Sequence, residues 1–125
     1  MINNHRFLKS FGYAWEGLRY VFKHDQNIRI HFLVGILVII FSLALDVNPF
    51  EMGILGIMII LVIVTEMINS TMEKIVDLIT KEHHEEARIA KDVSSGMVLL
   101  TAIGSVIVGI LIFLPHILKL LQFKS

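Results

Sequence analysis

The chain has 125 residues, of which 55% are hydrophobic and 18% are charged, and its formal net charge at pH 7 is zero. A mean hydropathy of +0.75 excludes an ordinary water-soluble globular protein. The absence of cysteine excludes disulfides and thiolate metal sites. The length predicts one domain over 1–125, and the apolar residues gather in three long runs that indicate how this domain is built.

The segment 5–24 has the pattern of an amphipathic helix. From Phe7 onwards, apolar residues recur at i, i+1, i+4, i+7 and i+8, and basic residues occupy the other side. The segment carries too many charges to span a membrane, but its aromatic residues and basic side are typical of a helix lying in the membrane interface. We expect that placement. The alternative is that the helix packs on the bundle as a fourth member.

Three apolar runs predict three transmembrane helices. A bilayer crossing needs about 20 apolar residues, and the run 96–118 meets that need alone. The runs 30–47 and 52–65 meet it if their polar ends lie among the lipid headgroups. The fold class is therefore an all-α membrane protein: a helical bundle of three transmembrane helices plus an N-terminal amphipathic surface helix. We expect the helices that contain the spans at about 28–47, 51–80 and 91–120.

The boundaries of these helices carry their own signals. Asp25 could cap the first spanning helix, because Asp favours that position. The sequence Asn48-Pro49 predicts a tight link to the second helix. In the third helix, a row of small residues at i, i+4 and i+8 predicts close packing against a neighbouring helix. That row consists of Thr101, Ser105 and Gly109.

Basic residues are distributed unevenly around the three runs. Five precede the first run and four lie between the second and the third, whereas the link 46–51 has none. By the positive-inside rule, the N-terminus and the 74–92 loop are cytoplasmic. We therefore expect a multi-pass protein of the cell inner (plasma) membrane.

Polar side chains form one stripe along the end of the second spanning helix. Glu66, Asn69, Glu73 and Asp77 fall at i, i+3, i+7 and i+11, which is one side of a helix. Glu66 lies ~21 Å along the helix from residue 52, inside an apolar slab ~30 Å thick. An acid at this depth is costly and usually marks a functional site. The alternative is that Glu66 and Asn69 pair with polar partners only to hold the bundle together.

The stripe has the chemical groups that phosphoryl transfer needs. Burial and neighbouring negative charge both disfavour an ionised carboxylate, so Glu66 could act as a general base. Glu73 and Asp77, nearer to water, suit Mg²⁺, and Asp25 might supply another ligand. Lys91 offers positive charge to a transferred phosphoryl group. The chain has no GxxxxGK[ST] loop, and these residues alone do not identify a kinase.

The charged corner 81–92 contains His83 and His84 among glutamates. Adjacent histidines point to different sides of a helix, and the spacing of a zinc site is not met. From the residues alone, a solvated charged corner is the preferred interpretation.

Four linked motifs resemble the small prokaryotic diacylglycerol kinase/undecaprenol kinase family. EMINSTMEKIVD at 66–77 is similar to the family signature E-x-x-N-[ST]-x-x-E-x-x-x-D. AKDVSSG follows at 90–96, and FGYAWEGLR at 11–19 and DQNIRIH at 25–31 match the family's N-terminal pattern. The similarity runs over nearly the whole chain, from about Arg6 to the third spanning helix.

The resemblance implies a membrane homotrimer that transfers the γ-phosphate of MgATP to a lipid alcohol at the cytoplasmic face. It implies that Glu66 is the catalytic base and contacts the lipid, with Ser95 near the lipid. It also implies that Asp25 and Glu73 bind Mg²⁺, although the family usually has Glu at the first of these positions. The implied ATP-binding residues are Arg6, Tyr13, Asp25, Asn69, Glu73, Asp77, Glu82, His83, His84, Lys91 and Asp92.

The NIRIH run is similar to the Gram-positive undecaprenol kinases, whereas the corner lacks the proline that is common in them. We expect undecaprenol as the acceptor, with diacylglycerol as the alternative, and no nucleic-acid partner. Two other classes stay open at this point. A small proton-coupled transporter could also use an intramembrane Glu, and a purely structural membrane subunit would leave Glu66, Asn69, Glu73 and Lys91 unexplained.

Overall fold

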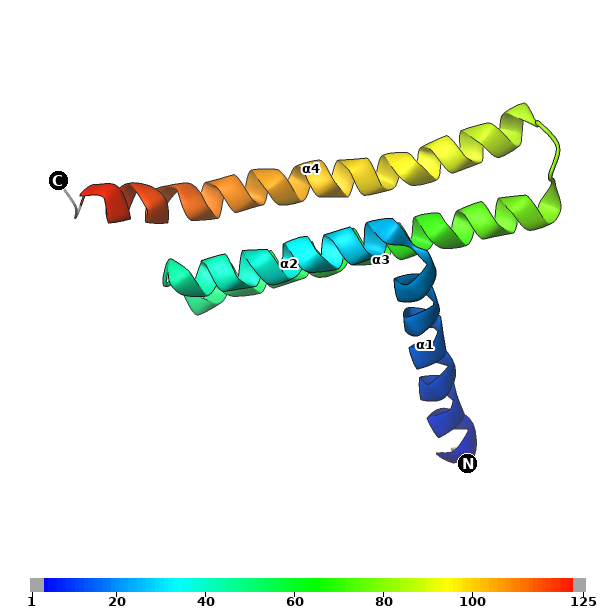
Figure 1. Ribbon diagram of the computed structural model, residues 1–125, viewed down its shortest axis with the longest axis horizontal. Helices are drawn as coiled ribbons and strands as arrows, with labels where there is room; N and C mark the ends of the chain where they lie inside the picture. The colour runs from blue at the N-terminus through cyan, green and yellow to red at the C-terminus, as the bar shows by residue number, and fades with distance from the viewer. Residues whose placement is uncertain (1–3, 123–125) are drawn as a thin grey trace.

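The computed structural model describes residues 4–122, which form four α-helices joined by short turns. Three of them are long and apolar enough to cross a membrane. The described part of the chain has no β-strand, so the predicted all-α fold class is confirmed. The helices are α1 (Asn4–His24), α2 (Gln26–Ala44), α3 (Pro49–Ile79) and α4 (Glu85–Gln122) (Figure 1).

Asp25 alone separates α1 from α2. Its backbone is extended, with φ −107° and ψ 115°, and its carboxylate accepts hydrogen bonds from the backbone N–H groups of Asn27 and Ile28. These bonds satisfy donors that a helix start leaves unpaired. The predicted cap is therefore confirmed, and the extended residue lets the chain change direction sharply between the two helices.

The link between α2 and α3 is equally short. Asn48 caps α3 by accepting a hydrogen bond from the backbone N–H of Glu51 at 2.9 Å, and Pro49 occupies the first turn, where it loses no helical bond. Asp46 has a positive φ of 53°, which the short polar side chain of Asp tolerates. The tight turn predicted from Asn-Pro thus makes α2 and α3 neighbours.

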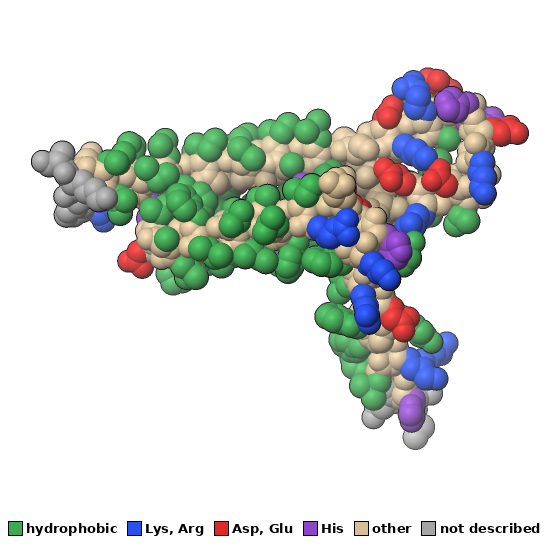
Figure 2. All heavy atoms as spheres, in the orientation of Figure 1, with side chains coloured by type: hydrophobic (Ala, Val, Ile, Leu, Met, Phe, Trp, Pro, Cys, Tyr) green, Lys and Arg blue, Asp and Glu red, His purple; other side chains and the backbone are tan. Residues whose placement is uncertain are grey.

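The helices α2, α3 and α4 lie side by side as a long bundle (Figure 1). One end, called the polar end below, consists of residues 24–31 and 66–92. At the opposite end, Val47, Leu55 and Ile112 form a buried apolar cluster, and Glu51 of α3 lies 3.5 Å from His116 of α4. Much of the apolar surface along the bundle stays exposed (Figure 2), as it does on helices that face lipid.

The bounds of two helices differ from the predicted ranges. α2 ends at Ala44 rather than near 47, because the chain turns at Asp46. α4 begins at Glu85 rather than near 91, and its first turn holds Glu85 and Glu86, which a helix N-terminus favours electrostatically. Lys91 therefore lies two turns inside a helix.

Helix α1 projects away from the bundle at a steep angle (Figure 1). Its apolar side chains lie along one side and its charged ones along the other (Figure 2), and Phe11 and Trp15 are 63% and 68% exposed. Contact with the bundle is made near its C-terminal end, where the rings of Phe22 and Phe32 meet at 5.4 Å. The alternative prediction, in which α1 packs along the bundle as a fourth helix, is therefore wrong. The apolar side of α1 stays exposed and is available to a membrane surface.

Among the glycines, Gly35 of α2 has the least space, because a Cβ atom there would lie only 2.8 Å from Cγ2 of Ile59 in α3. At Gly109, in the predicted row of small residues, a Cβ atom would have no described atom of another helix within 4 Å. The prediction of tight packing at Gly109 is therefore wrong within this chain. The close contact belongs instead to α2 and α3.

We expect Gly35→Ala to be less stable than Gly53→Ala by about 1–3 kcal/mol, because β-branched Ile59 cannot easily move away from the added methyl group. Both changes alter helix propensity equally, and a Cβ at Gly53 meets nothing within 4 Å. Reversible unfolding in mixed micelles measures the difference. Equal stabilities would contradict the close contact.

Candidate functional site

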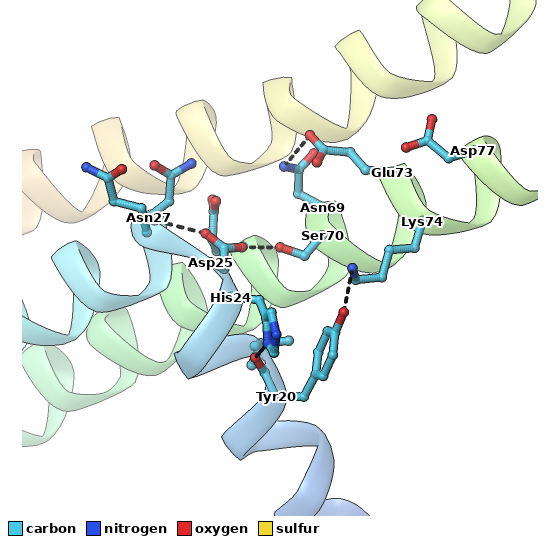
Figure 3. A pocket seen from close by; sticks show the side chains of 12 residues that line it. Tyr20, His24, Asp25, Asn27, Asn69, Ser70, Glu73, Lys74 and Asp77 are labelled. Atoms are coloured by element: carbon cyan, nitrogen blue, oxygen red, sulfur yellow. Dashed lines mark hydrogen bonds between the residues drawn. The ribbon is translucent and has the colours of Figure 1, made fainter. Parts of the chain in front are cut away.

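A pocket opens at the polar end, where α1, α2 and α3 meet (Figure 3). The predicted stripe lines it, so Glu66, Asn69, Glu73 and Asp77 do face the same space, and Asp25 joins them from the start of α2. The full lining is Tyr20, Val21, His24, Asp25, Gln26, Asn27, Glu66, Asn69, Ser70, Glu73, Lys74 and Asp77.

The unbroken length of α3 produces a gradient of burial along the stripe. Its 31 residues span about 46 Å at ~1.5 Å per residue, well beyond an apolar slab ~30 Å thick. Glu66 is 2% exposed and Asn69 is 7% exposed, whereas Glu73 and Asp77 are exposed to solvent. The pocket therefore runs from a buried carboxylate to water-facing carboxylates.

Hydrogen bonds tie three helices together at this pocket. Ser70 donates to Asp25 Oδ2, which joins α3 to the start of α2 (Figure 3). Asn69 Nδ2 donates to Glu73 Oε1 at 3.3 Å, and Ser95 Oγ of α4 donates to Asn69 Oδ1 at 3.4 Å. The Asn69 side chain thus makes hydrogen bonds with both Glu73 and Ser95. Ser95 therefore lies next to Asn69, which lines the same pocket as Glu66.

Lys91 of α4 binds Asp77 of α3, with 2.6 Å between Nζ and Oδ1. Lys91 precedes the apolar segment 96–118, outside the part of α4 that can cross the membrane. The hydrogen bond to Asp77 raises the pKa of Lys91 above its ordinary value, so the ammonium stays charged at neutral pH. The pair therefore places a permanent cation beside the acids of the pocket.

A second pocket adjoins the first at the α3–α4 corner and shares Asp77 with it. Glu82, His83 and His84, for which the resemblance implies ATP contacts, line this second pocket together with Lys91. The two pockets form one polar surface around the Asp77–Lys91 pair.

Three other residues with implied ATP contacts lie elsewhere. Arg6 and Tyr13 have exposed side chains on α1 and line neither of these two pockets. Asp92 is exposed and accepts a bond from Arg88 at 3.0 Å, while Arg88 also binds Glu85 at 2.7 Å. The single chain does not bring these residues to the stripe.

The structure adds side chains that sequence reasoning left out. His31 of α2 lies 3.9 Å from Glu66, between Nε2 and Oε2. Lys74 donates to the hydroxyl of Tyr20 at 3.3 Å and lies 4.9 Å from the centre of its ring, which stacks on His24 (Figure 3). In the sequence, His31 is part of the DQNIRIH motif, and no spacing pairs it with Glu66. No pattern paired Tyr20 with a lysine 54 residues away.

Asp25 has two separable roles, because Oδ1 caps α2 and the negative charge faces the pocket. We expect Asp25→Ala to lose about 1 kcal/mol of stability through the missing cap. Asp25→Asn keeps the capping oxygen, and its side-chain N–H group can donate to Ser70 Oγ in place of the bond that Asp25 accepts from Ser70, so it should keep the stability. On the Mg²⁺ role that the resemblance implies for Asp25, both variants should bind MgATP more weakly. Unfolding in micelles and nucleotide titration measure the two effects. Equal destabilisation by Asn and Ala would contradict the capping role.

Fold and site together define a multi-pass α-helical membrane protein with an acidic pocket at the end of its helices. Residues 12–113 match the model of the prokaryotic diacylglycerol kinase family. The chain belongs to this family of membrane lipid kinases, as its four motifs predicted.

The chain is similar to several curated proteins. It is 41% identical over 115 residues to the diacylglycerol kinase of Synechocystis sp., covering 91% of this chain and 66% of the relative, just under two thirds. It is 35% identical to the undecaprenol kinase of Bacillus subtilis, over 90% of this chain and 91% of the relative. It is 32% identical to the diacylglycerol kinase of Escherichia coli, over 89% and 91% respectively.

Proposed function

We propose that this protein transfers the γ-phosphate of MgATP to a membrane lipid alcohol at the cytoplasmic face of the inner membrane, with undecaprenol as the acceptor and diacylglycerol as the alternative. One observation carries the proposal: a single pocket holds a buried carboxylate, Glu66, at membrane depth and exposed carboxylates, Glu73 and Asp77, towards water. A lipid hydroxyl and a nucleotide are found in these two environments. The family membership supports the same reaction class.

In this proposal Glu66 is the catalytic base. The lipid hydroxyl approaches from the apolar side and gives its proton to the Glu66 carboxylate as its oxygen attacks the phosphorus. The pocket needs little further covalent chemistry, because phosphoryl transfer depends mainly on positioning and charge stabilisation. Ser95 Oγ donates a hydrogen bond to Asn69 Oδ1 at 3.4 Å, and Asn69 lines the same pocket as Glu66. This arrangement supports the lipid contact proposed for Ser95.

Asp25 and Glu73 would hold Mg²⁺. Both line the pocket, and carboxylate oxygens are the ligands Mg²⁺ prefers, usually one or two together with substrate phosphates. Among the described residues, no three His, Asp or Glu side chains gather as a ready-made metal site. Two carboxylates of one pocket would instead fit an ion whose other ligands are nucleotide phosphates and water. When bound, the ion would supply positive charge to those phosphates.

The proposed nucleotide site covers both pockets around Asp77. Lys91 would offer a cation to the transferred phosphoryl group. Glu82, His83 and His84 line the second pocket, where they would contact the rest of ATP. Arg6 and Tyr13 lie away from both pockets on α1. Their proposed ATP contacts therefore require that α1 moves, or that a second copy in the proposed homotrimer supplies them.

The acceptor is tested by competition. Purified protein in liposomes receives labelled ATP, Mg²⁺ and equal amounts of undecaprenol and diacylglycerol, and the two phosphorylated lipids are separated. The DQNIRIH motif and the Bacillus subtilis relative favour label on undecaprenol, whereas the relatives named diacylglycerol kinase favour the alternative. Predominant labelling of diacylglycerol would overturn the undecaprenol assignment, and labelling of neither lipid would overturn the proposed reaction.

A further inference from the structure

His31 of α2 faces Glu66 of α3, and Glu66 lines the pocket whereas His31 lies outside the lining. Nε2 of His31 lies 3.9 Å from Oε2 of Glu66. The Glu66 side chain is 3% exposed, whereas that of His31 is 24% exposed. In residues 4–122, no other basic side chain lies within 4 Å of the Glu66 carboxylate. A distance of this size is bridged by one water molecule or closed by a small side-chain rotation.

We propose that His31 is a positioning residue for Glu66 and the group that receives the substrate proton from it. The inference deepens the proposed function and rests on it. An imidazole titrates near neutral pH, and its two nitrogens let it pass a proton on. Glu66 itself has little contact with water, so a route for its proton must run through a neighbouring group. His31 is the neighbouring base that lies close to Glu66 and whose side chain is partly exposed to solvent.

The proposed step is balanced in atoms and charge. The O–H bond of the lipid breaks and its proton goes to the Glu66 carboxylate. The lipid oxygen forms a bond to the γ-phosphorus of ATP as the bond from that phosphorus to the bridging oxygen breaks, and ADP leaves. The proton then moves from Glu66 to Nε2 of His31, and the imidazolium releases it to water at the headgroup level.

Other titratable groups surround this pair. Those lining the pocket are Tyr20 and His24 on α1, Asp25 before α2, and Glu73, Lys74 and Asp77 on α3, with Lys91 of α4 bound to Asp77. Lys74 is engaged by Tyr20, and Lys91 by Asp77. Among the described residues, His31 is therefore the proton-accepting base that lies within 4 Å of the Glu66 carboxylate.

The molecule provides a matched control. At the opposite end of the bundle His116 lies 3.5 Å from Glu51, again between Nε2 and Oε2, and its side chain is 22% exposed. This second His–Glu pair also joins two helices, but it is far from the acidic pocket. A change at His116 disturbs a comparable pair without touching the proposed proton route.

The test compares His31→Gln and His116→Gln in the labelled-ATP assay over a range of pH. We expect His31→Gln to lower kcat about tenfold or more. The part of the fall in kcat at acid pH that comes from protonation of His31 should be absent in His31→Gln, because only an unprotonated imidazole can accept the proton from Glu66. His116→Gln should keep the unmodified profile. Identical profiles for His31→Gln and the unmodified chain would overturn the inference.

Imidazole rescue separates proton transfer from packing. His31→Ala leaves space beside Glu66, and added imidazole should restore a measurable part of kcat, whereas 1-methylpyrrole, which has no basic nitrogen, should not. If His31→Ala does not fold, the pH profile of His31→Gln decides. Loss of activity in a folded His31→Ala that imidazole fails to restore would overturn the role in proton transfer. Absence of turnover in the unmodified chain would instead overturn the proposed function itself, and the inference with it.

Discussion

Replacing Glu66 by Gln is expected to lower lipid phosphorylation by about 10²–10⁴-fold, which is the usual contribution of a general base. Glutamine has nearly the same shape as glutamate but cannot take the hydroxyl proton. Since Glu66 is only 2% exposed, the isosteric change keeps the packing and removes a buried charge, so the folded state should be at least as stable. Nucleotide titration should give an affinity for MgATP close to that of the unmodified chain.

Glu51→Gln is the matched control, because Glu51 is a partly buried acid on the same helix but lies at the opposite end of the bundle. It should leave turnover unchanged. Initial rates of label transfer to the lipid decide between the variants. If Glu66→Gln kept the rate of the unmodified chain, Glu66 would not be the base.

Replacing Lys91 by Met is expected to reduce kcat by about 10²–10³-fold, as the loss of one preorganised group facing the developing charge does elsewhere. Methionine keeps much of the aliphatic stem and removes the ammonium. The bond to Asp77 disappears as well, with 2.6 Å between the two atoms in the unmodified chain, so the loss of that bond must be separated from the loss of the cation.

Asp77→Asn separates them, because it weakens the same ion pair and leaves Lys91 charged. We expect a much smaller fall in kcat for Asp77→Asn than for Lys91→Met, with part of its effect appearing as a raised KM for ATP. Steady-state kinetics with ATP as the varied substrate measures both constants. Equal falls in kcat would mean that the ion pair, and not the cation, is what turnover requires.

The fold follows closely from local features of the sequence. Uninterrupted apolar runs predict the long helices, and the cap at Asp25 and the break at Asn48-Pro49 are explained by backbone hydrogen bonding that a short stretch determines by itself. The common face of Glu66, Asn69, Glu73 and Asp77 also follows from spacing, because α3 continues without a break past the polar residues.

What sequence reasoning missed lies in contacts between helices. The Ser70–Asp25 bond joins residues 45 apart and the Lys74–Tyr20 bond joins residues 54 apart, and helical spacing says nothing about which helix faces which. The direction of α1 depends on the one extended residue at Asp25. Likewise, the proximity of His31 to Glu66 depends on how α2 packs against α3, which the sequence does not specify.

The central claim is that a buried acid and water-facing acids in one pocket join a lipid hydroxyl to a nucleotide. The most direct test uses sealed liposomes with purified protein, both candidate lipids, Mg²⁺ and ATP labelled at the γ-phosphate, with external proton uptake recorded in parallel. We predict label on the lipid in the unmodified chain, labelling slower by about 10²-fold or more in Glu66→Gln, and no proton flux without ATP. Proton flux without ATP together with unlabelled lipid would contradict the account and favour a transporter.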